Sequence, residues 1–211
     1  MSLDWEVKFR DFVVETLADA DRAHTVDHIE RVVANARQLC EVEGADRDIV
    51  MPAAWLHDCV VVPKNSPNRS KASRLAAEKA GDYLTQLAYP LTLIPHIKHA
   101  IEAHSFSAGI PPKTLEAQVV QDADRLDSIG AIGVARCLLT GVSFDAQLYD
   151  RLDPFAEARP LDDKAYSIDH FEVKLFKLAG MMQTAAGRIE AERRTTFMRA
   201  FIDQLKSEIK P

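Results

Sequence analysis

Apolar residues recur every three or four positions along most of this chain, which is the period of an amphipathic α-helix. One stretch, Val60–Val62, has the composition of a β-strand, but it is short and stops at Pro63, so we expect an extended connection there. The pattern therefore predicts an all-α helical bundle without a sheet. Helices are expected over about residues 5–17, 29–40, 48–58, 75–87, 92–101 and 114–129, followed by an irregular stretch over about 141–166 and two more helices between 168 and 209.

Single residues mark several of the expected helix ends. Pro52 should lie in the first turn of the third helix, where a missing N–H costs little. Thr92 and Thr114 could each cap the helix that follows them. Gly44 should end the second helix, and Gly187 is the expected break between the last two.

The length of 211 residues suits one domain, and a hydrophobic content of 47% is enough to bury a sizeable core. We expect a single domain over residues 1–211, with its core over about 20–140 and a C-terminal helical extension over about 165–209. The long C-terminal helices could also pack against each other in a homodimer.

The formal net charge of −6 argues against non-specific nucleic-acid binding, which needs a broad basic surface. No stretch approaches the ~18 apolar residues of a membrane span, and the N-terminal residues include early acids and no apolar signal core. We therefore expect a cytoplasmic protein without a membrane partner. Cys40, Cys59 and Cys137 follow no metal-binding spacing and are expected to be buried thiols.

Histidine and aspartate are concentrated at three places. These are the stretch 24–28 (HTVDH), the pair His57-Asp58 and the stretch 121–127 (QDADRLD). Each is weak alone, because a lone histidine beside an apolar stripe, or an acidic run on a helix, is usually structural. Together, two imidazoles and two carboxylates could hold a divalent cation and leave coordination positions for water and substrate. Helical periodicity leaves Asp122 and Asp124 both open as the second carboxylate.

The order His … His-Asp … Asp resembles the HD-domain superfamily of metal-dependent phosphohydrolases. His28 precedes Arg31-Val32, as the first ligand of that family does, and the ADRL segment at 123–126 looks like the last motif of members that hydrolyse (p)ppGpp. The resemblance selects Asp124 over Asp122. It implies an HD-type helical bundle with the C-terminal helices packed on it and the metal ligands His28, His57, Asp58 and Asp124.

The resemblance extends over nearly the whole chain to the bacterial YedJ and YpgQ group of HD phosphohydrolases. Thr25 departs from the pattern, because the group often has Asp there, so an acid that would help to activate water is missing at that position. The shared blocks are KNSPNR at 64–69, AHSFS at 103–107, VQDADRL at 120–126, GAIG at 130–133, RPLDDK at 159–164 and DHF at 169–171.

A local basic cluster follows the His57-Asp58 pair on this acidic chain. Residues 59–77 contain Lys64, Arg69, Lys71 and Arg74 and no acid, so these side chains could hold phosphate oxygens. Lys71 could equally lie on a solvated helix face, whereas Lys64 and Arg69 fall in a block shared with the family. The resemblance implies Asp58, Lys64 and His104 as catalytic residues, with His104 a candidate proton donor, and Lys64, Arg69, Arg125, Asp127 and Lys174 as substrate-binding residues.

One divalent cation per chain is expected, with Mn, Mg, Ni, Co or Fe as its candidates. The histidines between His57 and Asp124 are bunched within residues 96–104, whereas two-metal members of the superfamily use widely separated extra ligands. Val61 and Val62 stand where (p)ppGpp hydrolases usually carry Glu-Asp, so that activity is not expected.

The resemblance implies a phosphohydrolase that acts on a phosphorylated small molecule, in the first place a nucleotide. The YpgQ kind implies a nucleoside triphosphate pyrophosphohydrolase, which releases a monophosphate and pyrophosphate. A phosphomonoesterase or nucleotidase is the nearest alternative. A non-catalytic HD module that binds metal and nucleotide, and a helical scaffold with incidental His and Asp residues, are the alternatives from other classes.

Overall fold

The structure is a computed structural model that describes residues 3–17, 26–60, 62 and 71–209. Within these ranges the regular elements are all helices, and the only β pairing is an isolated bridge between Gln147 and Tyr166. The predicted all-α fold is confirmed. The chain divides into two compact units, which are an N-terminal unit of Met1–Asp124 with Gln183–Gly187 and a C-terminal unit of Arg125–Met182 with Arg188–Pro211. The single domain remains a prediction.

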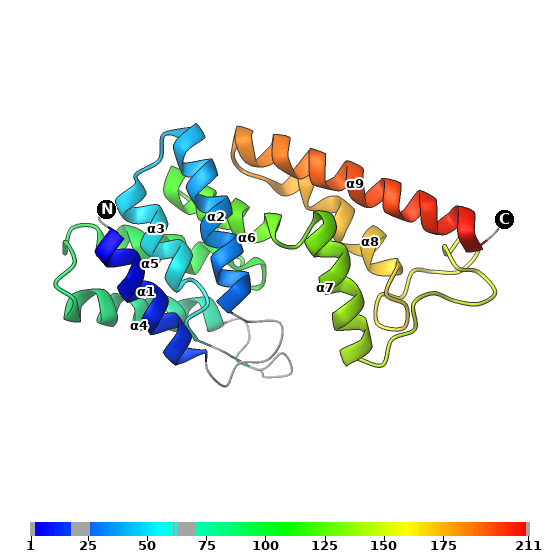
Figure 1. The fold of residues 1–211 in the computed structure, drawn as a ribbon, viewed down its shortest axis with the longest axis horizontal. Coiled ribbons are helices and arrows are strands. Elements are labelled where there is room, and N and C mark those ends of the chain that lie inside the picture. The colour runs from blue at the N-terminus through cyan, green and yellow to red at the C-terminus, as the bar shows by residue number, and fades with distance from the viewer. Residues whose placement is uncertain (1–2, 18–25, 61, 63–70, 210–211) are drawn as a thin grey trace. The chain divides into compact units, whose positions relative to one another are not determined.

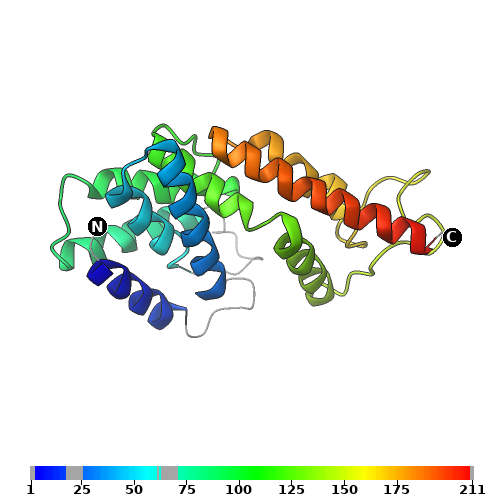
Figure 2. The same ribbon diagram turned by 45° about the horizontal axis from the view of Figure 1, so that its top comes forward.

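The N-terminal unit is built around one central helix. This is α3, which contacts α1, α2, α4 and α5 (Figures 1 and 2). Every residue of α3 from Ile49 to Leu56 is buried, and its sequence there, IVMPAAWL, is apolar all round, as expected of a helix with neighbours on every side. The helices of this unit are α1 (Leu3–Thr16), α2 (Val26–Glu43), α3 (Arg47–Leu56), α4 (Ala72–Gln86), α5 (Ile94–His104) and most of α6 (Leu115–Leu126), with a short 3-10 helix η2 (Phe106–Ala108).

The start of α3 corrects the predicted place of Pro52. Asp46 caps the helix by accepting a hydrogen bond from the Asp48 N–H at 2.8 Å. The helix therefore begins at Arg47, and Pro52 lies in its second turn. A residue with an N–H there would bond to the Asp48 carbonyl, and the Tyr89 hydroxyl donates to that carbonyl instead, at 2.7 Å. A neighbouring side chain thus compensates for the proline.

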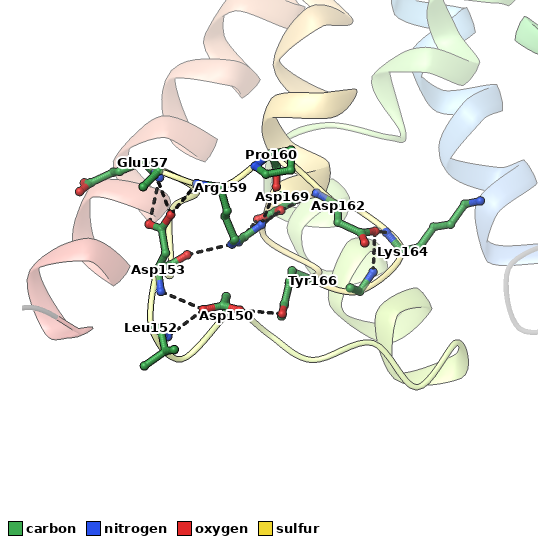
Figure 3. Close-up of polar contacts among 12 residues, drawn as sticks. Asp150, Leu152, Asp153, Glu157, Arg159, Pro160, Asp162, Lys164, Tyr166 and Asp169 are labelled. Carbon is green, nitrogen blue, oxygen red and sulfur yellow. Dashed lines mark hydrogen bonds and ion pairs between the residues drawn. The ribbon is translucent and has the colours of Figure 1, made fainter.

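The C-terminal unit contains α7 (Gly130–Ser143), α8 (Asp169–Val173), the 3-10 helices η3 (Leu175–Lys177) and η4 (Ala179–Met181) and most of α9 (Ala185–Ile209). The irregular stretch after α7 is ordered by carboxylates that accept backbone N–H bonds (Figure 3). Asp153 accepts from the N–H groups of residues 157, 158 and 159. Arg159 then donates two bonds to Asp169 and lies over the Tyr166 ring. A loop without helix or strand is held in this way by its own side chains.

Three further predictions of helix ends have different outcomes. Thr114 caps α6 as expected, because its Oγ1 accepts from the Ala117 N–H at 3.2 Å. Thr92 does not cap α5, which begins at Ile94 with Leu93 at the N-cap. The predicted break at Gly187 is wrong, because α9 runs without interruption from Ala185 and Gly187 lies in its first turn. The break comes before α9, in the short turns at 175–181.

Two composition-based predictions concern the cysteines and the membrane. Cys40 and Cys59 are buried, and Cys137 is half-buried. Burial raises the pKa of each thiol, to about 12 for Cys59, so all three stay protonated at neutral pH. In the part of the chain that the structure describes, no single helix is long and apolar enough to cross a membrane, and α6 and α7 pass that test only when joined across a bend.

We expect one ion-pair cluster on α9 to stabilise the fold in a pH-dependent way. Hydrogen bonds from Arg193 and Arg194 lower the pKa of Glu190 from 4.5 to about 2. A depressed carboxyl pKa stabilises the fold above about pH 4.5, and this stability is lost as the pH falls towards 2. Because the pair is partly solvated, we expect Glu190→Gln to lower the free energy of unfolding at pH 6 by about 0.5–1 kcal/mol. Urea unfolding at pH 6, 4 and 3 should show the difference from wild type shrinking with pH, and a constant difference would contradict this.

Candidate metal centre

Four side chains from distant parts of the N-terminal unit meet at one point. His28 lies in the first turn of α2, His57 and Asp58 follow the end of α3, and Asp124 lies in the last turn of α6. The Nε2 atom of His28 is 3.5 Å from Oδ1 of Asp124 and 3.9 Å from Oδ2 of Asp58. The Nε2 atom of His57 is 3.8 Å from Oδ2 of Asp58 and 3.9 Å from Oδ1 of Asp124. The two imidazole rings lie 5.5 Å apart, centroid to centroid.

These separations fit one shared cation. Two donor atoms that each lie about 2.1 Å from an ion can be no more than about 4.2 Å apart. The four nitrogen–oxygen distances are all below this limit. One donor atom from each of His28, His57 and Asp58 lies within 4.8 Å of the other two, so binding would require at most a small contraction.

The His57 ring is arranged as a metal ligand. Its Nδ1 donates to the carbonyl oxygen of Ala54 at 2.8 Å, which places the free lone pair on Nε2. That Nε2 atom is fully buried and has no hydrogen-bond partner among the described residues. A buried polar nitrogen without a partner is costly in a folded protein, and a cation among the four side chains would satisfy it.

The charge state of the cluster also suits a cation. Burial lowers the pKa of His57, so its imidazole is neutral at physiological pH. Burial alone would raise the pKa of Asp58 and Asp124, but the neighbouring histidines lower both pKa values well below the ordinary carboxyl range. Neutral imidazole and ionised carboxylate are the forms that bind divalent metals. The two carboxylate side chains are about a quarter exposed, at 25% and 26%, whereas the His57 side chain is fully buried, so solvent reaches the cluster from the carboxylate side.

His104 joins this group from the end of α5. Its Nδ1 donates to the carbonyl oxygen of Ile101 at 2.6 Å, and its Nε2 faces Oδ1 of Asp58 at 3.5 Å. The two oxygens of Asp58 are thus divided, because Oδ2 faces His28 and His57. Burial would lower the pKa of His104, but the hydrogen bond and charge of Asp58 outweigh it and raise that pKa. The structure places this predicted catalytic residue beside the predicted ligands.

The structure also separates the two aspartates that helical periodicity left open. Asp124 faces the imidazoles of His28 and His57. Asp122 is fully buried elsewhere on α6 and accepts hydrogen bonds from the N–H groups of Gln183 and Thr184 and from the Thr184 hydroxyl, at 2.8–3.1 Å. Asp122 therefore anchors the chain just before α9, and its oxygens are occupied by protein donors.

The predicted substrate-binding residues are distributed differently. Lys64 and Arg69, like Thr25, lie outside the described residues. Arg125, Asp127 and Lys174 belong to the C-terminal unit. There the Arg125 guanidinium donates to the Met181 carbonyl, the buried Asp127 carboxylate pairs with Arg136, and Lys174 is exposed.

Two other side chains of the N-terminal unit, one basic and one histidine, have structural contacts. The Lys79 ammonium donates to the Cys59 carbonyl at 3.4 Å and lies over the Phe12 ring. His99 Nε2 accepts a hydrogen bond from the Lys113 N–H at 3.0 Å. Both side chains therefore have structural contacts to the backbone.

Sequence reasoning overlooked two buried amides that contact the helices of the site. Asn35 Nδ2 donates to the Ala123 carbonyl, and Gln121 Nε2 donates to the Ala103 carbonyl. Asn35 could have been noticed as a polar residue on the otherwise apolar face of α2, seven positions after His28. Gln121 could not have been distinguished from a solvated helix residue.

Comparisons with known proteins agree with this geometry. The family model for the HD domain matches residues 25–129. The protein YpgQ of Bacillus subtilis (strain 168) is 32% identical over 206 residues, which make up 96% of this chain and 92% of YpgQ.

Solved structures give the same result. Bacillus subtilis YpgQ in complex with ADP matches with a TM-score of 0.78 and 31% identity, and the match covers 99% of this chain and 96% of that chain. An HD-superfamily hydrolase from Bacillus thuringiensis matches with a TM-score of 0.77 and 33% identity, over 97% of this chain and 96% of that chain. Similarity in sequence and in fold therefore extends along nearly the full length of these chains.

Proposed function

This chain belongs to the HD-domain family, and on that basis we propose that it is a metal-dependent phosphohydrolase with its active site at the candidate metal centre. The observation that carries the proposal is the convergence of His28, His57, Asp58 and Asp124 on one point, where the buried Nε2 of His57 has no hydrogen-bond partner in the part of the chain that the structure describes. One divalent cation, from among Mn, Mg, Ni, Co and Fe, fits these nitrogen and oxygen donors.

Each residue of the site would contribute a defined part of the chemistry. A divalent cation supplies Lewis-acid polarisation of a phosphoryl oxygen and activation of water near neutral pH. His28, His57, Asp58 and Asp124 would hold the cation, and the carboxylates of Asp58 and Asp124 are partly exposed to solvent. His104, with its raised pKa and its Nε2 beside Asp58, would retain a proton for the leaving group.

We assign the substrate to the nucleotides. Support comes from the structure of YpgQ with ADP, because that chain matches this one over nearly its whole length. Cleavage of a nucleoside triphosphate to a monophosphate and pyrophosphate is the reaction proposed first. Lys64, Arg69, Arg125 and Lys174 are proposed to hold phosphate oxygens, since guanidinium and ammonium groups match their charge. Asp127 is the weakest of the predicted substrate contacts, because its carboxylate already pairs with Arg136.

One panel tests the proposal. The purified protein is incubated with nucleoside tri-, di- and monophosphates and with p-nitrophenyl phosphate, each with Mn, Mg, Ni or Co, and phosphate and pyrophosphate are measured separately. We expect nucleotide hydrolysis that disappears with EDTA and returns when the metal is restored. Pyrophosphate as the product supports the pyrophosphohydrolase, and inorganic phosphate from monophosphates supports the nucleotidase.

Two results would contradict the enzyme assignment. Saturable metal and nucleotide binding without turnover under any condition would mean that the protein is a non-catalytic HD module. If the protein bound no divalent metal, the four side chains would have a structural role only. Turnover that survives EDTA would contradict the metal dependence itself.

A further inference from the structure

The C-terminal half of α6 is bonded to neighbouring elements at the three consecutive residues that precede Asp124. Gln121 Nε2 donates to the Ala103 carbonyl on α5 at 2.6 Å. Asp122 accepts the bonds from residues 183 and 184 that were described above. The Ala123 carbonyl accepts from Asn35 Nδ2 on α2 at 3.1 Å. The segment that leads to the metal-ligand candidate at 124 is therefore bonded to α5, to residues 183–184 and to α2.

The bond from Asn35 differs from the other two because it begins on the helix that carries His28. Asn35 lies seven positions after His28, which is about two turns of α-helix, so both side chains lie on the same face of α2. That face meets α6 at two points, at 3.5 Å between His28 Nε2 and Asp124 Oδ1 and at 3.1 Å between Asn35 and Ala123. The contact between Asn35 and Ala123 thus fixes the spacing of α2 and α6 next to the contact between His28 and Asp124.

The Ala123 carbonyl belongs to the residue that directly precedes Asp124. It lies in the last turn of α6. Ala123 is fully buried, so water is a poor substitute for the amide. Metal–ligand distances tolerate deviations of only about 0.2 Å. A small movement of this turn would therefore be enough to carry Asp124 out of coordination distance of a cation shared with His28.

We propose that Asn35 is a positioning residue of the metal centre, whose bond to the Ala123 carbonyl holds Asp124 opposite His28. This inference rests on the proposed function, in that it presupposes a cation held by His28, His57, Asp58 and Asp124. Asn35 itself provides no ligand. Loss of a partner outside the ligand set commonly weakens metal binding about 10–100-fold, and we expect an effect of that size when the amide donor is removed.

Two variants and two readouts test the proposal. Asn35→Leu has a similar size and no donor, and Asn35→Ser keeps a polar group that is too short to reach the carbonyl. Binding of Mn²⁺, followed by electron paramagnetic resonance, should weaken about 10–100-fold in both variants. The visible absorption of bound Co²⁺, which reports the ligand geometry, should move away from that of the wild type and towards that of Asp124→Ala. If Asn35→Leu does not fold, Asn35→Ser decides the question.

The matched control is Tyr89→Phe, which removes another bond from a side-chain donor to a backbone carbonyl, at the start of α3. It should lower the melting temperature and leave the Mn²⁺ affinity and the Co²⁺ spectrum unchanged. The proposal is overturned if folded Asn35 variants behave like this control. Failure of the wild-type protein to bind Mn²⁺ would overturn the proposed function together with this inference, whereas wild-type binding that is lost in Asp124→Ala and retained in the Asn35 variants would remove this inference alone.

Discussion

Replacing Asp124 with alanine is expected to abolish metal-dependent hydrolysis while the protein stays folded. The variant loses one of the two carboxylates that face the imidazoles of His28 and His57. Metal catalysis supplies several kcal/mol of transition-state stabilisation, and each 1.36 kcal/mol changes the rate tenfold. We therefore expect the turnover rate to fall by a factor of about 10³ or more, with a parallel loss of Mn²⁺ affinity. Steady-state kinetics at saturating metal and a Mn²⁺ binding titration measure the two effects.

The fold of this variant should survive because the Asp124 side chain is partly exposed and, among the described residues, its ion-pair contacts are those with the histidines of the cluster. Circular dichroism and thermal unfolding in EDTA should therefore resemble those of wild type. Retention of more than a tenth of the activity in Asp124→Ala would show that this carboxylate is not a ligand. If Asp124→Ala lost its activity because it unfolded, the result would indicate a structural role for Asp124.

Replacing Asp122 with alanine, two residues away, is expected to have the opposite consequence. Its buried carboxylate accepts bonds from the N–H groups of Gln183 and Thr184 and from the Thr184 hydroxyl. Leaving a buried donor without a partner costs about 1–3 kcal/mol, so the free energy of unfolding should fall by about 2–4 kcal/mol. Urea unfolding monitored by circular dichroism measures this change. The Mn²⁺ affinity of the protein that remains folded should stay within a few-fold of wild type.

Gly187→Ala provides an independent test of the same anchor. An added Cβ at Gly187 would lie 2.4 Å from Oδ2 of Asp122 and 2.7 Å from Oγ1 of Thr184, which is far inside contact distance. Overpacking of this kind costs about 1–3 kcal/mol. Asp122→Ala removes the oxygen that clashes, so the double variant should lose less stability than the two single effects added together. Strict additivity, or wild-type stability of Asp122→Ala, would contradict the anchor.

Much of the fold could be predicted because helical period is a local property of the chain. The apolar stripes placed α2 and α4 to within a few residues, and the Thr114 cap was correct. The errors at Pro52 and Gly187 share one cause. Each residue was interpreted from local backbone preferences, whereas Tyr89 compensates for the proline and the close approach of Asp122 accounts for the glycine. Residues distant in sequence make both contacts, so neither could be derived from the segment itself.

The sequence by itself predicts the helical character of the chain. It also contains the residue types that a divalent cation needs, which are two imidazoles and two carboxylates in the order His, His-Asp, Asp. Both follow from side-chain chemistry and from the 3.6-residue period. The orientation of Asp122 and Asp124 cannot be derived from the sequence, since helical periodicity leaves both open as the second carboxylate. The tertiary structure decides between them. Asp122 bonds to residues 183–184 and serves as an anchor, whereas Asp124 faces His28 and belongs to the cluster. That assignment, like the bond from Asn35, depends on distances between helices, which no single stretch of sequence contains.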